Sequence, residues 1–408
     1  MKKKIKELAI FSGKPAFEKQ LHIGSPNIGD REQLFDRIGS ILDRRWLTND
    51  GPLVREFEKR AASIIGAKHC IAVSNATSAI EITARALGLK GEVIIPSFTF
   101  IATAHALQWQ GIKPVFCDID AHTRCIDPRE AEKLITPRTT AIMGVHLWAR
   151  TCDIDALSGI AKKHNLRLIF DAAQAFGCSY KGRMVGGFGD AEIFSFHATK
   201  FLNTFEGGAV ATCHDDLARK VRMMRNFGFS DYDNVGHIGI NAKMTEIAAA
   251  MGLTGLESMK EFIEVNYRNH KEYQEGLKDI PGISLLAYGQ REKSSYHYVV
   301  CELDDAAGGI SRDQLVDILW AENVLARRYF YPGCHRQQPY RSDLHYSNVH
   351  LPETERAAQC VFLLPTGTAV NTDDIRKICR IIRLVAGHGY EVRERLSCYD
   401  KGRIYAAA

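Results

Sequence analysis

Short apolar runs alternate with amphipathic stretches through the first half of the chain. The apolar runs are too brief for helices and are rich in β-branched residues, so each one predicts a buried strand. They lie at residues 70–73, 93–95, 114–118, 141–145, 167–170, 193–196 and 209–212. Stretches with helical spacing separate several of them, as at residues 153–164. This alternation predicts an α/β fold in which helices cover both faces of a mainly parallel sheet.

The pattern changes after a long charged helix, which we expect at residues 256–277. Residues 294–300 alternate like a strand, and Ser311 to Gln314 form a capping-box sequence that opens a helix over residues 315–322. A chain of 408 residues is also too long for one ordinary core. We therefore predict a large domain with an N-terminal arm at residues 1–260, and a smaller α+β domain at residues 261–408.

Composition narrows the class of protein. The chain is 45% hydrophobic and 25% charged, with a net charge of +5 and no basic stripe, so a nucleic-acid partner is not expected. No apolar stretch is long enough for a signal-peptide core or a membrane span. Eleven cysteines without a C-x-x-C pair indicate free thiols in a reducing cytoplasm and no metal site.

Two polar groups follow neighbouring predicted strands. One strand ends at Ser195 and leads to Thr199 and Lys200, and another ends in Asp171. Parallel strands present ligands at their carboxyl ends, so Lys200 and Asp171 are expected at one sheet edge. A lysine can bond an aldehyde as a Schiff base, and a carboxylate can keep a pyridine nitrogen protonated. Pyridoxal phosphate needs both groups. Taken alone, Lys200 would be interpreted as an ordinary surface lysine.

A third group lies after the strand at residues 70–73, where Asn75 and Thr77 precede a helical pattern. A strand, a turn of small polar residues and a helix start together make an anion site, because free amides and the helix dipole point at the same place. A plain helix N-cap by Asn75 or Thr77 explains the same residues. Further along, Gly207 and Gly208 permit either unusual backbone angles or close packing.

Nucleotide-binding glycine motifs are incomplete. The run that begins at Gly177 has Arg183 and Met184 where a phosphate loop needs lysine and a hydroxyl. For His146 and His197 we expect packing or hydrogen-bonding roles, because neither has a ligand-like spacing.

Six motifs occur in a fixed order over nearly the whole chain. They are Trp46-Leu-Thr-Asn-Asp-Gly-Pro-Leu-Val with Phe57-Glu58, Pro96-Ser-Phe-Thr-Phe-Ile-Ala-Thr, Val145-His-Leu, Asp171-Ala-Ala-Gln-Ala-Phe-Gly, Phe194-Ser-Phe-His-Ala-Thr-Lys with Glu206-Gly-Gly, and Met244-Thr-Glu. In these motifs the chain resembles the DegT-type nucleotide-sugar aminotransferases. These are pyridoxal-phosphate enzymes with the aspartate-aminotransferase fold.

The resemblance implies a mixed, mostly parallel seven-stranded sheet in the large domain and a cytoplasmic homodimer with shared active sites. It implies that Lys200 bonds the cofactor and that Asp171 pairs with its ring nitrogen. Gln174 would approach the ring hydroxyl, and Phe100 would stack on the ring. The implied phosphate contacts are Asn75, Ala76, Thr77, Ser195 and, from the partner subunit, Asn241. Asn75 stands where many members have glycine, which we expect to be tolerated because asparagine accepts left-handed backbone angles.

The segments Phe196-His-Ala-Thr-Lys-Phe-Leu-Asn and Arg327-Arg-Tyr-Phe-Tyr-Pro-Gly-Cys-His most resemble members that aminate carbon four of a dTDP-4-keto-6-deoxyhexose with glutamate as donor. The expected substrate contacts are Trp46, Leu47, Thr48, Asn49, Tyr331 and His335. Amination at carbon three, a pyridoxal-phosphate lyase or dehydratase, and a non-catalytic nucleotide-binding protein remain open alternatives. The related dehydratases carry histidine in place of the lysine, so Lys200 favours transamination.

Overall fold

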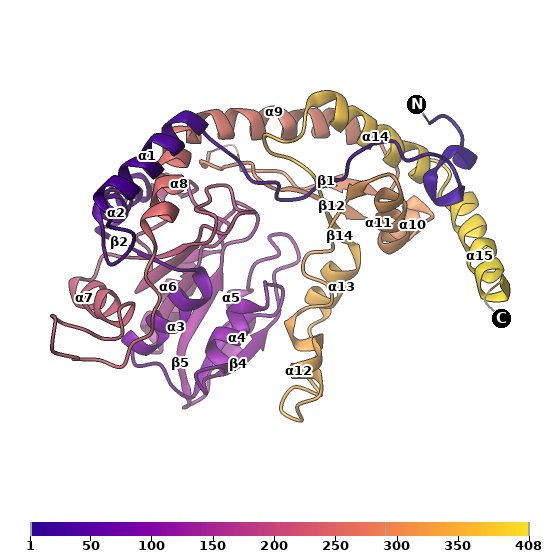
Figure 1. Cartoon of the computed structure of the whole chain (residues 1–408). Coiled ribbons are helices and arrows are strands. Elements are labelled where there is room, and N and C mark those ends of the chain that lie inside the picture. Colours follow the sequence, from indigo (N-terminus) through magenta and orange to yellow (C-terminus); the bar gives the residue numbers. More distant parts are fainter. Residues whose placement is uncertain (1, 290, 407–408) are drawn as a thin grey trace.

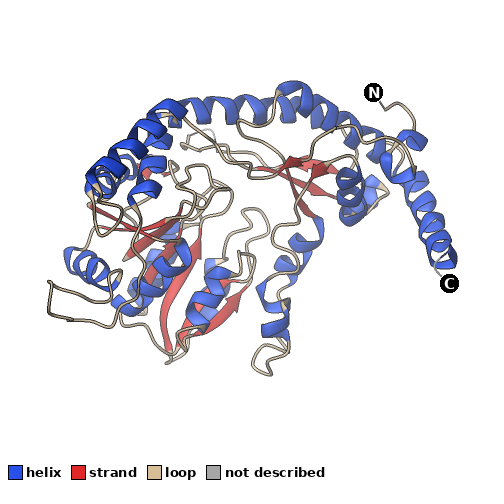
Figure 2. Cartoon of the chain, viewed as in Figure 1, coloured by secondary structure: helices blue, strands red, loops and turns tan. Residues whose placement is uncertain are grey.

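A seven-stranded sheet lies at the centre of the larger part of the molecule (Figures 1 and 2). The computed structural model describes residues 2–289 and 291–406. The strand order is β2-β10-β9-β6-β5-β3-β4. The bounds are β2 His69–Val73, β3 Glu92–Pro96, β4 Lys113–Cys117, β5 Thr139–Val145, β6 Arg167–Asp171, β9 Ala191–Ser195 and β10 Gly208–Thr212. β10 runs antiparallel to both neighbours, and the other pairs are parallel. The predicted mixed, mostly parallel α/β sheet is confirmed.

Helices cover both faces of this sheet because alternate strand residues point to opposite sides. Leu168 and Phe170 of β6 pack into one core, and Ile169 packs into the other. The first core is covered by α2 Pro52–Ile65, α5 Pro128–Lys133, α6 Ile154–Lys163 and α8 Glu246–Glu257. The second is covered by α3 Ala76–Ala86, α4 Ala102–Gln108 and α7 Asp215–Met224. α1 Arg31–Arg44 lies outside, against α8.

A smaller antiparallel sheet, in the order β11-β12-β14, forms the second part of the molecule. Its strands are β11 Ile283–Leu285, β12 Val299–Leu303 and β14 Val361–Leu364. The accompanying helices are α10 Asp305–Gly308, α11 Arg312–Ala321, α12 Gln338–Arg341, α13 Pro352–Cys360, α14 Thr372–Ala386 and α15 Gly389–Ala406. The capping box predicted at Ser311 and Gln314 is confirmed at the start of α11. Short pairs and turns complete the fold: β1 Leu21–His22 with β13 Val324–Leu325, β7 Ser179–Tyr180 with β8 Arg183–Met184, and η1 Ile5–Glu7, η2 Ala9–Phe11 and η3 Cys334–Arg336.

One helix, α9 Met259–Leu277, joins the two parts along the upper edge of the molecule (Figure 1). Phe262 near its start packs into the core of the large sheet, and Tyr273 near its end packs into the core of the small sheet. The N-terminal residues Ile5, Leu8 and Phe17 also pack into the second core. The division between residues 260 and 261 stays a prediction. The structure adds that the start of the chain lies against the smaller sheet.

The strand expected at residues 294–300 begins only at Val299. Tyr296 has a φ of 50°, outside the extended region, and the Ser295 carbonyl accepts a hydrogen bond from the Asn266 side chain at 2.9 Å. The Tyr296 ring packs against Tyr288, with ring centroids 4.9 Å apart. The alternating sequence therefore predicts the start of this strand wrongly. Side-chain contacts, and not pairing with a neighbouring strand, hold the backbone of residues 295 and 296.

The first testable prediction concerns His270 on α9, which is buried against these tyrosines. Burial lowers its pKa from 6.5 to about 4. Between these two values His270 is therefore protonated in the unfolded chain and neutral in the folded chain. Its contribution to the free energy of unfolding is fully present above pH 6.5 and is lost as the pH falls. Going from about pH 7 to about pH 5 should cost roughly 2 kcal/mol of unfolding free energy from this group.

The measurement is denaturant unfolding at both pH values at one protein concentration. His270→Gln should lose this part of the pH dependence, whereas the exposed His122→Gln should keep it. An unchanged pH dependence in His270→Gln would contradict the assignment.

Candidate active site

The ends of β6 and β9 bring together the two groups that the sequence singles out. These strands are parallel neighbours, with Asp171 opposite Ile193 in the register. Asp171 is the last residue of β6, and the chain leaves β9 at Ser195 and turns to reach Lys200. In that turn the Lys200 amide donates to the His197 carbonyl at 2.9 Å. The charge of Asp171 acts on the Lys200 amine, so the two groups share one site.

The Asp171 carboxylate is buried, with 6% of the residue exposed, and each of its oxygens has a donor. Thr103 Oγ1 donates to Oδ2 at 2.8 Å, and the Ala173 amide donates to Oδ1 at 3.1 Å. The Thr99 hydroxyl lies 3.0 Å from that of Thr103 and extends the chain of hydrogen bonds. A buried carboxylate held in this way is a fixed negative charge for a cationic partner.

The Lys200 amine lies in a protein environment that favours its neutral form. Desolvation lowers the pKa of Lys200, and the Asp171 carboxylate opposes this lowering without cancelling it. The residue is only half-buried, so a ligand can reach it. An amine with a lowered pKa is a better nucleophile and a better base near neutral pH than an exposed lysine.

The start of α3 forms the candidate anion site. Asn75 caps this helix, because its Oδ1 accepts from the Ser78 amide at 2.8 Å. The first-turn amides of Ala76 and Thr77 have no partner within the helix. The N-cap by Asn75 is confirmed. The anion site stays a prediction, for which these two amides are available. The expected left-handed backbone at Asn75 is wrong, since its φ of −169° is extended and open to any residue.

The glycine pair serves close packing at this point. A Cβ on Gly208 would lie 2.6 Å from the amide nitrogen of Ala76, so only glycine lets β10 approach the helix start. Gly208 is also opposite Ser195 in the strand register. Ser195 and the Ala76 amide therefore lie at one edge of the sheet, and Thr77 follows in the first turn of α3. This set of hydroxyl and amide donors fits a phosphate group.

The side chains expected around the cofactor ring lie in the loops at this edge. Gln174 is half-buried, and its Oε1 accepts from the Trp148 amide at 2.9 Å, which leaves its NH₂ group available as a donor. Phe100 is 60% exposed and follows β3. Asn241 is exposed in the loop between α7 and α8. Each therefore retains surface that a ligand or a second chain can contact.

The segment from Trp46 to Asn49 is fixed at its base by Glu246, which is completely buried. The Leu47 carbonyl accepts from the Glu246 amide at 2.9 Å, and the Glu246 carboxylate accepts from the Leu53 and Val54 amides at 3.1 and 2.9 Å. Thr48 is half-buried, whereas Trp46, Leu47 and Asn49 are exposed. The two motifs therefore interlock and present the predicted substrate side chains at the surface.

Tyr331 and His335 differ in their access to a ligand. Tyr331 is 43% exposed, with the Arg312 guanidinium over its ring at 5.5 Å. His335 is only 1% exposed, and its ring nitrogens lie 2.7 Å from Ser97 Oγ and 3.1 Å from Glu355 Oε1. The geometry therefore argues against a sugar-nucleotide contact by His335, because both of its polar atoms are already used inside the protein.

Sequence reasoning gave no role to three residues that support the site. Thr103 donates a hydrogen bond to Asp171, and the Trp148 amide donates one to Gln174. The Glu246 amide donates one to the segment that begins at Trp46. Thr103 and Glu246 stand inside the quoted motifs, so the motifs marked them without revealing their partners. His146 is buried between Glu192 and Cys152, as expected for a packing histidine.

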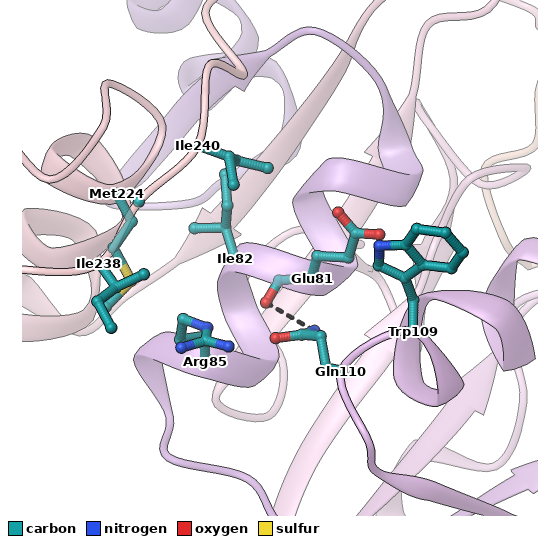
Figure 3. A pocket seen from close by; sticks show the side chains of 9 residues that line it. Glu81, Ile82, Arg85, Trp109, Gln110, Met224, Ile238 and Ile240 are labelled. Carbon is teal, nitrogen blue, oxygen red and sulfur yellow. Dashed lines mark hydrogen bonds between the residues drawn. The ribbon is translucent and has the colours of Figure 1, made fainter.

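A separate cavity of about 290 Å³ opens beside α3, between Trp109 and Ile238 (Figure 3). Glu81 and Arg85 lie in its wall, and the Gln110 side chain donates to the Glu81 carbonyl at 3.0 Å. None of the predicted site residues lines this cavity. It is therefore distinct from the site at the strand ends.

Other classes of site receive no support from the described residues. Within residues 2–289 and 291–406, no helix is both long and apolar enough to cross a bilayer. The same part of the chain contains no group of three or more histidine, cysteine or acidic side chains arranged to hold a metal ion. All eleven cysteines are free thiols.

Comparison with known proteins places these features in a family. The profile of the DegT/DnrJ/EryC1/StrS aminotransferase family matches residues 29–383. A dTDP-4-amino-4,6-dideoxy-D-glucose transaminase of Shigella dysenteriae is 38% identical over 90% of this chain and 99% of its own length. The Escherichia coli protein of the same name is 33% identical over 90% and 98%. The crystal structure of DesI in the presence of its TDP-sugar product is 49% identical, with a TM-score of 0.93 over 96% of this chain and all of that one.

The hydrogen bond between Thr103 and Asp171 yields the second prediction. Thr103→Val keeps the side-chain shape but leaves a buried carboxylate oxygen without its donor, which should lower the unfolding free energy by about 1–3 kcal/mol. Denaturant unfolding measures the change. Thr83→Val is the matched control, because Thr83 is equally buried and its hydroxyl has no hydrogen-bond partner among residues 2–289 and 291–406. Equal stability of the two variants would contradict the role of Thr103.

Proposed function

Because the chain belongs to the DegT/DnrJ/EryC1/StrS aminotransferase family, we propose that it is a pyridoxal-phosphate enzyme that aminates carbon four of a dTDP-4-keto-6-deoxyhexose. Glutamate is the proposed amino donor, and dTDP-4-keto-6-deoxy-D-glucose is the proposed acceptor. The observation that carries the proposal is the meeting of a desolvated lysine and a buried carboxylate at the ends of two parallel strands. The names of the relatives from Shigella and Escherichia support the choice of carbon four.

The residues at the site fit the cofactor group by group. Asp171 would hold the ring nitrogen in its protonated form, since its carboxylate is fixed by Thr103 and Ala173. The first-turn amides of α3 and the hydroxyls of Thr77 and Ser195 would bind the phosphate. When bound, pyridoxal phosphate supplies an aldehyde that carries the amine and a ring that withdraws electrons from the reacting carbon.

The remaining ring contacts follow from the free polar and apolar surface. Gln174 would donate its NH₂ group to the ring hydroxyl, because its carbonyl oxygen is already used by Trp148. Phe100 would cover one face of the ring with its exposed side chain. Trp46 to Asn49 and Tyr331 would contact the sugar nucleotide.

Lys200 has two tasks in this proposal. Its amine would first hold the cofactor covalently. Once the incoming amino donor displaces it, Lys200 Nζ would carry a proton from the α carbon of glutamate to the cofactor carbon that receives the amine. In the second half-reaction it would carry a proton from that carbon to carbon four of the sugar. Bonding the cofactor and taking up a proton both need the neutral amine, and the desolvation that lowers the pKa of Lys200 favours that form.

A homodimer in the cytoplasm completes the proposal. The loop between α7 and α8 exposes apolar side chains, among them Phe227 at 47%, Tyr232 at 99% and Ile238 at 76%. Such a surface is typical of a subunit interface. The loop also carries Asn241, which would reach the phosphate bound by the partner subunit. The eleven free cysteines support a reducing compartment.

The direct test is mass analysis of the products formed from glutamate and a panel of nucleotide-linked 3-keto and 4-keto sugars. We expect an amino sugar only from the 4-keto substrates, together with 2-oxoglutarate, and no turnover by Lys200→Ala because the proton carrier is gone. Lys90→Ala, on the surface, should leave the rate unchanged. Preferred use of a 3-keto sugar, or normal turnover by Lys200→Ala, would refute the proposal.

Asp171→Ala should leave the ring nitrogen without its buried counter-charge. We expect a loss of roughly 3–5 kcal/mol of transition-state stabilisation, which is about two to four decades in kcat/KM. Steady-state kinetics with saturating cofactor measure this loss. A decrease of less than about tenfold would mean that another group serves the ring nitrogen.

A further inference from the structure

The two peptide carbonyls that flank Lys200 are both held by side chains from outside the large sheet. The carbonyl oxygen of Thr199, just before the lysine, lies 3.1 Å from His297 Nε2. The carbonyl oxygen of Phe201, just after it, accepts from Asn27 Nδ2 at 3.0 Å. Asn27 precedes α1, and His297 lies just before β12 of the smaller sheet.

The Asn27 side chain connects the loop that carries Lys200 to the smaller domain. It is 1% exposed, and its backbone carbonyl accepts from Asn203 Nδ2 at 2.8 Å. Its Oδ1 lies 3.3 Å from the Thr368 amide and 3.2 Å from the Thr368 hydroxyl, in the loop between β14 and α14. One side chain thus joins the residue after Lys200 to the loop that follows the second sheet.

His297 binds the residue before Lys200, and this hydrogen bond fixes the position of the proton on the histidine ring. A carbonyl oxygen only accepts, so the hydrogen bond to Thr199 requires the proton on Nε2. The residue is 4% exposed and packs edge-on against Phe201, with ring centroids 6.1 Å apart. Burial lowers its pKa to about 4, which keeps the ring neutral beside the Lys200 amine.

The N-terminal segment also lies directly on the lysine loop. It runs from the smaller sheet across to α1 (Figure 1). A Cβ on Gly24 would lie 2.7 Å from the Cβ of Thr199, and Gly24 has a φ of +72°, so both space and backbone call for glycine. The loop that carries Lys200 is therefore enclosed by parts of the chain that pack with the second sheet.

We propose that Asn27 and His297 are positioning residues that orient the Lys200 amine by holding the carbonyls on either side of it. Lys200 stands beyond the end of β9, where strand pairing no longer fixes the backbone. The two side chains supply the missing constraint and tie the lysine to the smaller domain. The proposal rests on the function proposed for Lys200, and neither residue needs to touch the cofactor.

The test compares two buried asparagines that bind the same loop of the smaller domain. Asn27→Asp keeps the acceptor for Thr368 but replaces the donor to Phe201 by an oxygen. Asn269→Asp is the matched control, because Asn269 is fully buried and donates to the Gly367 carbonyl at 3.1 Å without contacting the lysine loop. A second pair uses His297→Phe, which removes the donor, and His297→Gln, whose amide can replace it.

The measurement is the rate at which pyridoxal with borohydride labels Lys200 in the cofactor-free full-length protein, followed by peptide mass spectrometry. We expect Asn27→Asp and His297→Phe to label at least about tenfold more slowly than the wild-type protein, because a misplaced reacting group loses such factors. Asn269→Asp and His297→Gln should label at the wild-type rate. With cofactor, the first two variants should lose kcat while KM for the sugar nucleotide is unchanged.

Equal labelling rates in Asn27→Asp and Asn269→Asp would overturn the inference, since the asparagine would then be only structural. If Asn27→Asp does not fold, the two His297 variants decide in the same way. These failures leave the proposed function intact when the wild-type enzyme makes an amino sugar. A wild-type protein that labels at Lys200 but makes no amino sugar would instead refute the proposed function.

Discussion

The parallel pairing of β6 with β9 is the constraint on which the site depends. It sets Asp171 opposite Ile193 and brings the chain that leaves β9 to the same edge of the sheet. A carboxylate and an amine from separate parts of the sequence can then act on one another in a desolvated place. The carboxylate remains tolerable there because Thr103 and Ala173 donate to it. Without these donors the buried carboxylate would lack hydrogen-bond partners, which raises the free-energy cost of its burial.

The sheet alone does not orient the lysine. Strand hydrogen bonds end at Ser195, and the next residues form a turn. Contacts from the N-terminal segment and from the smaller sheet reach this turn at Gly24, Asn27 and His297. The loop that carries Lys200 therefore lies where the two parts of the molecule meet, although it belongs to the larger one. Side chains packed with the smaller sheet thus help to fix the backbone of the lysine loop.

A polar group can bind a ligand only where its donor or acceptor is not already used in a hydrogen bond inside the protein. Gln174 uses its oxygen internally and keeps its NH₂ group, and α3 keeps two amides after Asn75 has capped it. His335 has both ring nitrogens engaged and is closed to solvent. The family resemblance gave roles to Gln174 and His335, and the strand, turn and helix start gave one to the beginning of α3. Only the hydrogen bonds of the folded protein distinguish the groups that remain available to a ligand from those that do not.

The sequence by itself determined the strands of the larger domain and several of its helices, the approach of the Asp171 and Lys200 segments to one sheet edge, and the family. These features depend on local periodicity and on residues at strand ends, which the linear pattern records directly. Tertiary structure decided that residues 294–298 are not a strand, that Asn75 has an extended backbone, and that His335 is buried. It also decided the partners of Thr103, Glu246 and Asn27. Such contacts join residues far apart in the chain, so their energy depends on packing that no local pattern contains.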